Sequence, residues 1–226
     1  MKKQVSPTFM VAGLIFTVCL IVANITAQKT ISIAGFSATA ALLVFPVSYI
    51  VNDLIVEVWG YKKARFIIWS GFLMNFFAVL IFQLSILIPA NQFYPHAEAF
   101  DTVLGSTLRL TFASFVSFLL GSFVNAYIMS KMKILQKGKG FSIRAIISTL
   151  AGEGIDSMFF FFIAFVGLMP TKNILELTIH IALMKTAYEI LVLPITAFLV
   201  KKIKLKEGVD VYDHDQNYNP FKINEL

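Results

Sequence analysis

Charged residues and cysteine are both scarce in this chain. Only 14% of its 226 residues are Asp, Glu, Lys or Arg, whereas 58% are hydrophobic, and the mean hydropathy is +0.77. A soluble domain of this size has too small an interior to bury that much apolar surface, so the composition excludes one. The single cysteine, Cys19, lies inside an apolar run, which excludes a disulfide framework and a cysteine-based metal site.

Three catalytic motifs are also missing. There is no Gly-x-x-x-x-Gly-Lys-Ser/Thr loop, so the chain is not expected to hydrolyse nucleotides itself. Neither His-Glu-x-x-His nor Gly-x-Ser-x-Gly is present, which leaves a hydrolase without an obvious metal or nucleophile. We therefore expect a protein that is not an enzyme and that uses no metal and no cofactor.

Six apolar segments are each long enough to cross a bilayer, which takes about 20 mainly apolar residues in a helix. The sequence therefore predicts an all-α integral membrane protein with six transmembrane helices in one domain, residues 1–200, and a polar cytoplasmic tail, residues 201–226. The first segment lacks a small-residue cleavage site after a short core, so we expect it to be retained. The predicted spans are residues 9–27, 39–56, 66–88, 108–129, 145–168 and 175–200.

Basic residues gather on one side of these spans. Fifteen of the 19 Lys and Arg residues lie before the first span, between the second and third, between the fourth and fifth, or in the tail. Cytoplasmic loops are enriched in Lys and Arg, so this distribution predicts that both termini are cytoplasmic. The net charge of +6 is then a topology signal, and no nucleic acid partner is expected.

Ionisable residues inside the spans are the candidates for function. At bilayer depth such a group costs about 2.5–3.5 kcal/mol on insertion scales, so it normally faces the bundle interior and finds a partner. At 1.5 Å per residue, Glu153 and Asp156 lie about 14 and 18 Å into the fifth span, and Lys185 about 15 Å into the sixth. Because the two spans run in opposite directions, the three side chains are predicted to meet near the membrane midplane.

Helical spacing extends this group. Glu153 and Asp156 are an i,i+3 pair, Lys185 and Glu189 are an i,i+4 pair, and Tyr188 lies about one turn from Lys185. Lys185 either neutralises one acid in a structural ion pair or belongs to a ligand site. Since three acids accompany one lysine, an acid remains that needs a cation, a proton or a hydrogen-bond donor from a ligand.

A second charged cluster follows the second span. Asp53 and Glu57 share a helix face near its cytoplasmic end, and Arg65 lies within reach after a turn. The cluster is predicted to be either a salt bridge that closes the inner mouth or a ligand contact. Pro46 removes one backbone donor and is expected to kink or loosen the second span.

Small and amide side chains in the spans predict close helix packing. Gly152 and Gly154 flank Glu153 and are expected to let another helix or a flat ligand approach the backbone. Asn24, Asn75 and Asn125 lie in three other spans, and hydrogen bonds between helices are the expected role of each.

Over nearly its whole length the chain resembles the queuosine precursor transporters, also grouped as the VUT or vitamin uptake transporter family. The order and spacing of many residues together carry the resemblance: Phe45-Pro46, Tyr49, Asp53, Glu57, Gly60, Ala64-Arg65, Arg109, Ala113-Ser114, Ser148-Thr149, Asp156, Ile163-Ala164-Phe165, Tyr188-Glu189, Pro194-Ile195-Thr196, Lys201, Glu207, Asp210 and Asn219-Pro220-Phe221. The resemblance implies a bacterial inner-membrane protein similar in fold to the substrate-binding component of energy-coupling-factor transporters. It also implies import of 7-deazaguanine bases or related queuosine precursors.

Such a substrate suits the predicted midplane acids. A guanine-like base offers N1–H and an exocyclic amine side by side to one carboxylate, Glu153 or Asp156, while its carbonyl oxygen accepts from Lys185. Tyr188 and Glu189 would complete this pocket, and a second acid would balance an aminomethyl group on the substrate. Asp53 and Glu57 would line the cytoplasmic exit.

Two other classes of function stay open. The chain is alternatively the binding subunit of a larger transporter that depends on separate ATPase and coupling proteins, or an intramembrane enzyme with Asp53 and Asp156 as an acid pair. The sequence does not give the energy source, and it leaves a homo-oligomer possible.

Overall fold

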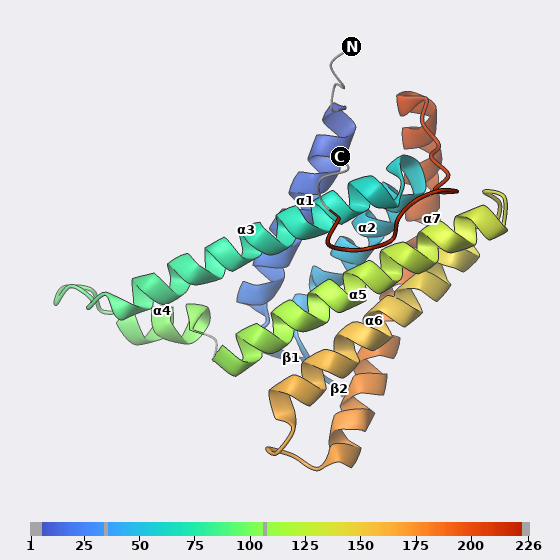
Figure 1. Cartoon of the computed structure of the whole chain (residues 1–226). Coiled ribbons are helices and arrows are strands. Elements are labelled where there is room, and N and C mark those ends of the chain that lie inside the picture. Colours follow the sequence, from blue (N-terminus) through green and yellow to red (C-terminus); the bar gives the residue numbers. More distant parts are fainter. Residues whose placement is uncertain (1–5, 34–35, 106–107, 223–226) are drawn as a thin grey trace.

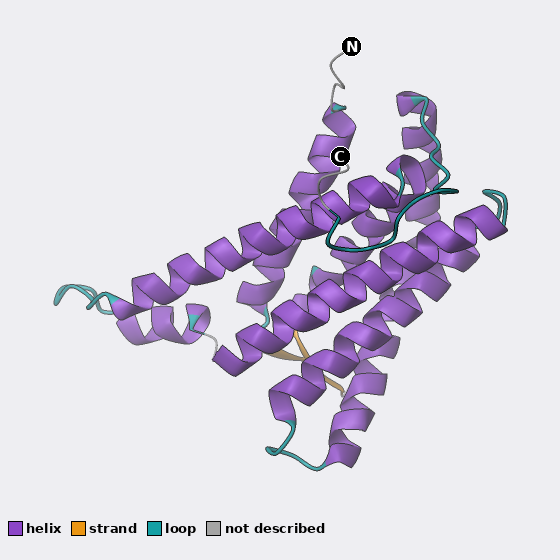
Figure 2. Cartoon of the chain, viewed as in Figure 1, coloured by secondary structure: helices purple, strands orange, loops and turns teal. Residues whose placement is uncertain are grey.

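The computed structural model describes residues 6–33, 36–105 and 108–222 (Figure 1). It is mostly helical, with one short β-hairpin (Figure 2). The elements in chain order are α1 (Pro7–Thr26), β1 (Thr30–Ile33), β2 (Phe36–Thr39), the short 3₁₀ helix η1 (Ala40–Leu43), α2 (Phe45–Trp59), α3 (Tyr61–Leu87), α4 (Ala97–Leu104), α5 (Leu108–Leu135), α6 (Phe141–Phe165) and α7 (Thr171–Glu207).

Six of these segments are long and apolar enough to cross a membrane. Each overlaps one predicted span, so the predicted all-α, six-span membrane protein is confirmed. Large apolar side chains on the outside of the bundle remain exposed, among them Leu191 at 79% and Phe198 at 64%. In a soluble protein this surface would be unfavourable, but it suits contact with lipid chains.

Helix α2 is the central helix of the bundle. Every residue from Ser48 to Trp59 is buried, and α2 packs against α1, α3, α5 and α7. Helices α5, α6 and α7 form consecutive antiparallel hairpins, with α6 packed against both neighbours. Charged residues of α2 therefore face protein rather than lipid.

The two ends of the bundle differ in character. The basic end carries the start of α1, the α2–α3 and α5–α6 turns and the end of α7 (Figure 1). The hairpin end carries the antiparallel β1–β2 pair, α4 and the α6–α7 turn. The hairpin and α4 were not predicted, because each is too short and too polar to stand out among the long apolar runs.

Pro46 does not kink a span as predicted. It lies in the first turn of α2, where a helix has no backbone acceptor for the missing N–H, so it helps to begin the helix. Gly60 alone separates α2 from α3, with a φ of 84°. That left-handed conformation strains any residue with a Cβ, so glycine is required at this turn.

Residues 209–222, here named the C-terminal strap, fold back over the basic end. Arg65 donates to the carbonyl oxygens of Asn217 and Asn219 at 3.1 and 2.9 Å, and Trp69 donates to that of Pro220 at 2.8 Å. Asp213 is buried and accepts from the Tyr61 N–H and the Ser130 hydroxyl. This part of the predicted polar tail therefore packs against the bundle, because its backbone carbonyls and Asp213 supply acceptors to buried donors.

Candidate functional site

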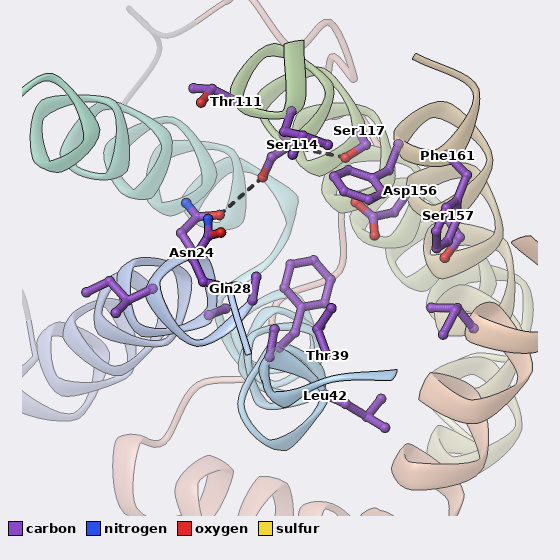
Figure 3. Close-up of a pocket in the computed structure, with 18 of the residues that line it drawn as sticks. Asn24, Gln28, Thr39, Leu42, Thr111, Ser114, Ser117, Asp156, Ser157 and Phe161 are labelled. Carbon is purple, nitrogen blue, oxygen red and sulfur yellow. Dashed lines mark hydrogen bonds between the residues drawn. The ribbon is translucent and has the colours of Figure 1, made fainter. Parts of the chain in front are cut away.

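A cavity of about 410 Å³ lies between the helices and extends toward the hairpin end. Residues of α1, the hairpin, η1, α2, α3, α4, α5, α6 and α7 line it. Figure 3 shows Asn24 of α1 and Gln28, two residues after this helix, on one side and Asp156, Ser157 and Phe161 of α6 on the other. Its volume falls in the range of about 300–1,000 Å³ that is usual for small-molecule sites.

The inner end of the cavity carries a buried charge cluster. Lys185 of α7 lies 2.8 Å from Asp156 Oδ2 and 2.7 Å from Glu153 Oε2, both on α6. Its ammonium also stands 4.1 Å above the ring of Phe45, the first residue of α2. Three helices thus converge on one cation, which receives two carboxylates and an aromatic face. The predicted meeting of Glu153, Asp156 and Lys185 is what the structure has.

Close packing beside Glu153 holds this cluster in place. Gly152 of α6 and Gly121 of α5 face each other, and Tyr49 of α2 packs against both. A Cβ on Gly152 would lie 2.7 Å from Asn125 Cβ and 2.9 Å from Gly121 O. The expected role of Gly152 in helix approach is therefore confirmed, whereas a Cβ at Gly154 would meet open space.

Amide side chains link the helices around the cavity. Asn24 donates to Asn75 at 2.8 Å, and Ser114 donates to Asn24 at 3.2 Å in the cavity wall (Figure 3). Asn52 donates to Asn125 at 2.8 Å. The prediction that Asn24, Asn75 and Asn125 bond between helices is confirmed. Because Asn24 and Ser114 also line the cavity, they present polar atoms to its contents.

Two further carboxyl groups meet deeper in the bundle. Asp53 of α2 and Glu189 of α7 are buried, with exposed fractions of 0% and 2%, and their carboxyl groups lie within hydrogen-bonding reach of each other. Ser148 donates to Asp53 at 3.4 Å. Lys185 and Glu189, although spaced i,i+4, form no ion pair with each other, because Lys185 turns toward α6 and Glu189 toward α2.

A third cluster closes the basic end. Arg144 forms a two-pronged pair with Glu57, with Nε–Oε2 at 2.9 Å and Nη2–Oε1 at 2.7 Å. Lys204 lies 2.5 Å from Glu57 Oε1 and 2.8 Å from Asp210 Oδ1. Lys133 donates to the Glu57 carbonyl and to Asp210. Glu57 is therefore surrounded by three cations from α5, α6 and α7.

Arg65 is not among those cations. Its guanidinium reaches the carbonyl oxygens of the strap, so of the two predicted alternatives the salt bridge of Arg65 with Asp53 or Glu57 is not formed. The turn at Gly60 directs α3 away from the Glu57 side chain, and Arg144 fills the place at Glu57.

Asp210 of the strap pairs with two of these cations, Lys133 and Lys204. Partial burial alone would raise the pKa of this carboxyl, but hydrogen bonds from Lys133 and Lys204 outweigh it, so the pKa lies below its ordinary value. Asp210 is therefore ionised at neutral pH and ties the strap to the ends of α5 and α7.

Only some of the predicted substrate-binding residues line the cavity. Asp156 and Lys185 line the cavity, and Glu153 lies against Lys185. Tyr188 and Glu189 are not among the residues that line it. Sequence reasoning missed cavity residues whose types are common in any span and which carry no charge signal: Asn24, Gln28, Phe45, Thr111, Ser114 and Ser117.

No metal-binding arrangement is found in the part of the chain that the structure describes. Within those residues, no group of three or more His, Cys, Asp and Glu side chains is placed to hold an ion. The buried carboxyl groups of Glu153 and Asp156 instead face a lysine, and those of Asp53 and Glu189 face each other.

Comparison with known proteins gives a consistent picture. The family model described as "Putative vitamin uptake transporter" matches residues 39–199. A Bacillus subtilis (strain 168) protein named "Probable queuosine precursor transporter" is 26% identical over 188 residues, 83% of this chain and 80% of that protein. An Escherichia coli (strain K12) protein named "Queuosine precursor transporter" is 29% identical over 174 residues, 75% of this chain and 73% of that protein. No solved structure gives a significant match.

Proposed function

The chain belongs to the vitamin uptake transporter family, and we propose that it imports queuosine precursors, that is 7-deazaguanine bases or related compounds, across a bacterial inner membrane. The names of both curated relatives support this substrate class. The observation that carries the proposal is a cavity of about 410 Å³ whose inner end presents a carboxylate and an ammonium side by side. Both relatives are named as transporters, so the chain is proposed to move its ligand unchanged.

The chemistry of the inner end suits a guanine-like edge. Asp156 accepts the N1–H and the exocyclic amine, and Lys185 donates to the carbonyl oxygen next to them. All three hydrogen bonds involve a charged partner, which makes each worth about 1.5–3 kcal/mol. If the substrate carries an aminomethyl group, Glu153 offers a second negative charge beside Lys185.

The cavity walls suit the flat faces of such a base. Phe45, Phe160 and Phe161 line the cavity and supply aromatic surface for stacking. Asn24 and Ser114 add hydrogen-bonding atoms on the opposite wall. A ligand held in this way is recognised by both its edge and its faces, as a planar heterocycle requires.

The direction of transport follows from the charge distribution. Basic residues favour the cytoplasmic side, so the basic end and both termini are proposed to face the cytoplasm. The cavity then extends toward the outside, and the Glu57 cluster together with the strap closes the basic end of the bundle. The structure fits an outward-facing state that waits for substrate.

Uptake of labelled 7-deazaguanine precursors by proteoliposomes containing only this protein tests the proposal. We expect Asp156→Asn to lower exchange of label about 10- to 100-fold, because one charge-assisted contact of about 1.5–3 kcal/mol is lost. Glu153 remains to pair with Lys185, so the variant should still fold. The matched control is Asp101→Asn on the exposed helix α4.

Two results would overturn the proposal. The pocket is placed wrongly if Asp156→Asn exchanges label as fast as the wild type. If the wild type binds the precursor but never moves it, the chain acts instead as a binding subunit that needs separate energising proteins.

A further inference from the structure

The Asp53–Glu189 pair can form a hydrogen bond only if one of the two carboxyl groups carries a proton. An ionised carboxylate has acceptors and no donor, so two ionised carboxylates cannot bond to each other. The two carboxyl groups are nevertheless within bonding reach, and Asp53 Oδ2 and Glu189 Oε2 have no other partner among the described residues. One shared proton turns this contact into a hydrogen bond.

Among the described residues, no Lys, Arg or His forms an ion pair with Asp53 or Glu189. From α5 and α6 the neutral side chains of Asn125, Ser148 and Thr149 approach it. The charged or titratable neighbours are Glu57 and Tyr49 on α2 and Glu153 on α6, none of which is a cation. An unpaired acid buried at this depth is costly, so the pair favours a bound proton.

The nearby cations are engaged elsewhere. Lys185 bridges Glu153 and Asp156, and Arg144 is committed to Glu57. Lys133 and Lys204 bridge Glu57 and Asp210. Four buried acids near the cavity, namely Asp53, Glu153, Asp156 and Glu189, thus share one lysine.

The pair lies between the cavity and the closed basic end. Phe45, Tyr49, Asp53 and Glu57 recur every four residues on α2, with about 6 Å between successive members. Phe45 contacts Lys185 and Glu57 contacts Arg144, which places Asp53 between the two clusters. On α7, Glu189 is likewise one turn beyond Lys185 toward the basic end.

We infer that Asp53 and Glu189 form a proton-binding site that couples substrate import to the proton gradient, an inference that rests on the proposed function. When the proton is bound, a hydrogen bond joins α2 to α7 and keeps the basic end of the bundle closed. When the proton leaves toward the cytoplasm, two like charges remain in contact, and their repulsion separates α2 from α7 at that level. One proton thus enters from the cavity side and leaves inward with each substrate.

Proteoliposomes loaded with the full-length protein separate this inference from the proposed function. Exchange of labelled 7-deazaguanine precursor without any gradient reports binding and movement alone. Accumulation under an imposed pH gradient, acidic outside, reports coupling. We expect the wild type to exchange label and to accumulate it at least 10-fold under the pH gradient, but not under a sodium gradient.

Asp53→Asn tests the site directly. The amide keeps the shape of the side chain and donates to Glu189, so it imitates the protonated pair without releasing a proton. Because the protonated pair keeps the basic end closed, we expect Asp53→Asn to bind labelled precursor but neither to exchange nor to accumulate it, and Glu189→Gln should behave in the same way. Glu176→Gln, on the exposed face of α7, is the matched control and should accumulate normally.

Each outcome of these experiments either supports the inference or overturns one of the two proposals. Wild-type exchange that ignores the pH gradient overturns the inference and leaves the proposed function standing, whereas wild type without exchange overturns the proposed function. Accumulation by Asp53→Asn at the wild-type level also overturns the inference. If Asp53→Asn fails to insert, a pH-sensitive dye outside wild-type vesicles decides: alkalinisation during substrate influx supports a carried proton, and a constant pH contradicts it.

Discussion

Lys185 occupies a buried position, unlike Lys172 on the same helix. It is enclosed by α2, α6 and α7 and carries the positive charge for two buried carboxylates. Removing one partner of a buried ion pair leaves an uncompensated charge, whereas removing an exposed partner leaves a charge that water solvates. The same helix contains both situations, since Lys172 pairs with Glu176 on its surface.

Lys185→Met should therefore destabilise the protein far more than Lys172→Met. Loss of the buried cation is expected to cost about 3–5 kcal/mol, because Glu153 and Asp156 keep their burial without a counter-charge. Thermal unfolding of the purified proteins in detergent measures the difference. Lys172 is 85% exposed, so its replacement should leave the melting temperature almost unchanged. Equal melting temperatures for the two variants would contradict the buried-charge reading of Lys185.

Residue type alone predicted the charged part of the site and little else. Glu153, Asp156 and Lys185 were found because an ionisable group in an apolar run is rare, and rarity marks it. Partner choice was harder: Arg65 and Arg144 are both basic residues near the same membrane surface, and only the turn at Gly60 decides which one reaches Glu57. Uncharged cavity residues such as Gln28 have no comparable signal.

At the scale of elements, α5 and α6 pack closely because glycine, which has no side chain, lies where the two helices meet. Gly121 and Gly152 let the two backbones approach, and Tyr49 of α2 occupies the space that remains. This contact fixes the turn of α6 that carries Glu153 and Asp156. The position of the acids thus depends on neighbours that have no charge.

Gly152→Ala should destabilise this junction, whereas Gly154→Ala should not. The added methyl group at position 152 would lie 2.7 Å from Asn125 Cβ, and such overpacking costs about 1–3 kcal/mol. At position 154 a methyl group meets no atom within 4 Å, so the helix gains a better helix former without a clash. Melting temperatures in detergent compare the pair, and a Gly152→Ala protein as stable as Gly154→Ala would show that the helices can move apart freely.

Long elements were predictable and short ones were not. All six spans could be predicted from length and hydropathy. The observed helix ends differ from the predicted ones by a few residues because a helix can continue beyond its apolar segment, as α7 does to Glu207. Pro46 was assigned to the interior of a span, since the apolar run begins before α2 and η1 within it cannot be told from the helix that follows. Hydropathy reports environment, and it does not separate a helix from a short hairpin.

For the whole molecule, orientation is the property on which import depends. Cys19 is buried and is the single cysteine, so Cys19→Ala gives a background into which one reporter cysteine can be placed. Lys139→Cys at the basic end and Lys172→Cys at the hairpin end put that reporter on exposed loops or helix ends at opposite ends of the bundle.

In intact cells, a membrane-impermeant maleimide should label the cysteine at position 172 and not the one at position 139. Permeabilised cells should label both, which serves as the control for accessibility. This result is expected because Lys and Arg favour the cytoplasmic side. Labelling of position 139 alone in intact cells would place the cavity toward the cytoplasm and reverse the proposed direction of transport.

The C-terminal strap also sets an order of events during synthesis. Arg65 and Trp69 belong to a helix that leaves the ribosome early, yet their acceptors on Asn217, Asn219 and Pro220 lie 152, 154 and 151 residues further along the chain. Until residues 209–222 have been synthesised, the guanidinium at the basic end has no strap to bond to, and Gly60 has no Asp213 beside it. The helices can insert as a nascent chain, but the strap closes the basic end only afterwards, so closure of this end follows insertion of the helices.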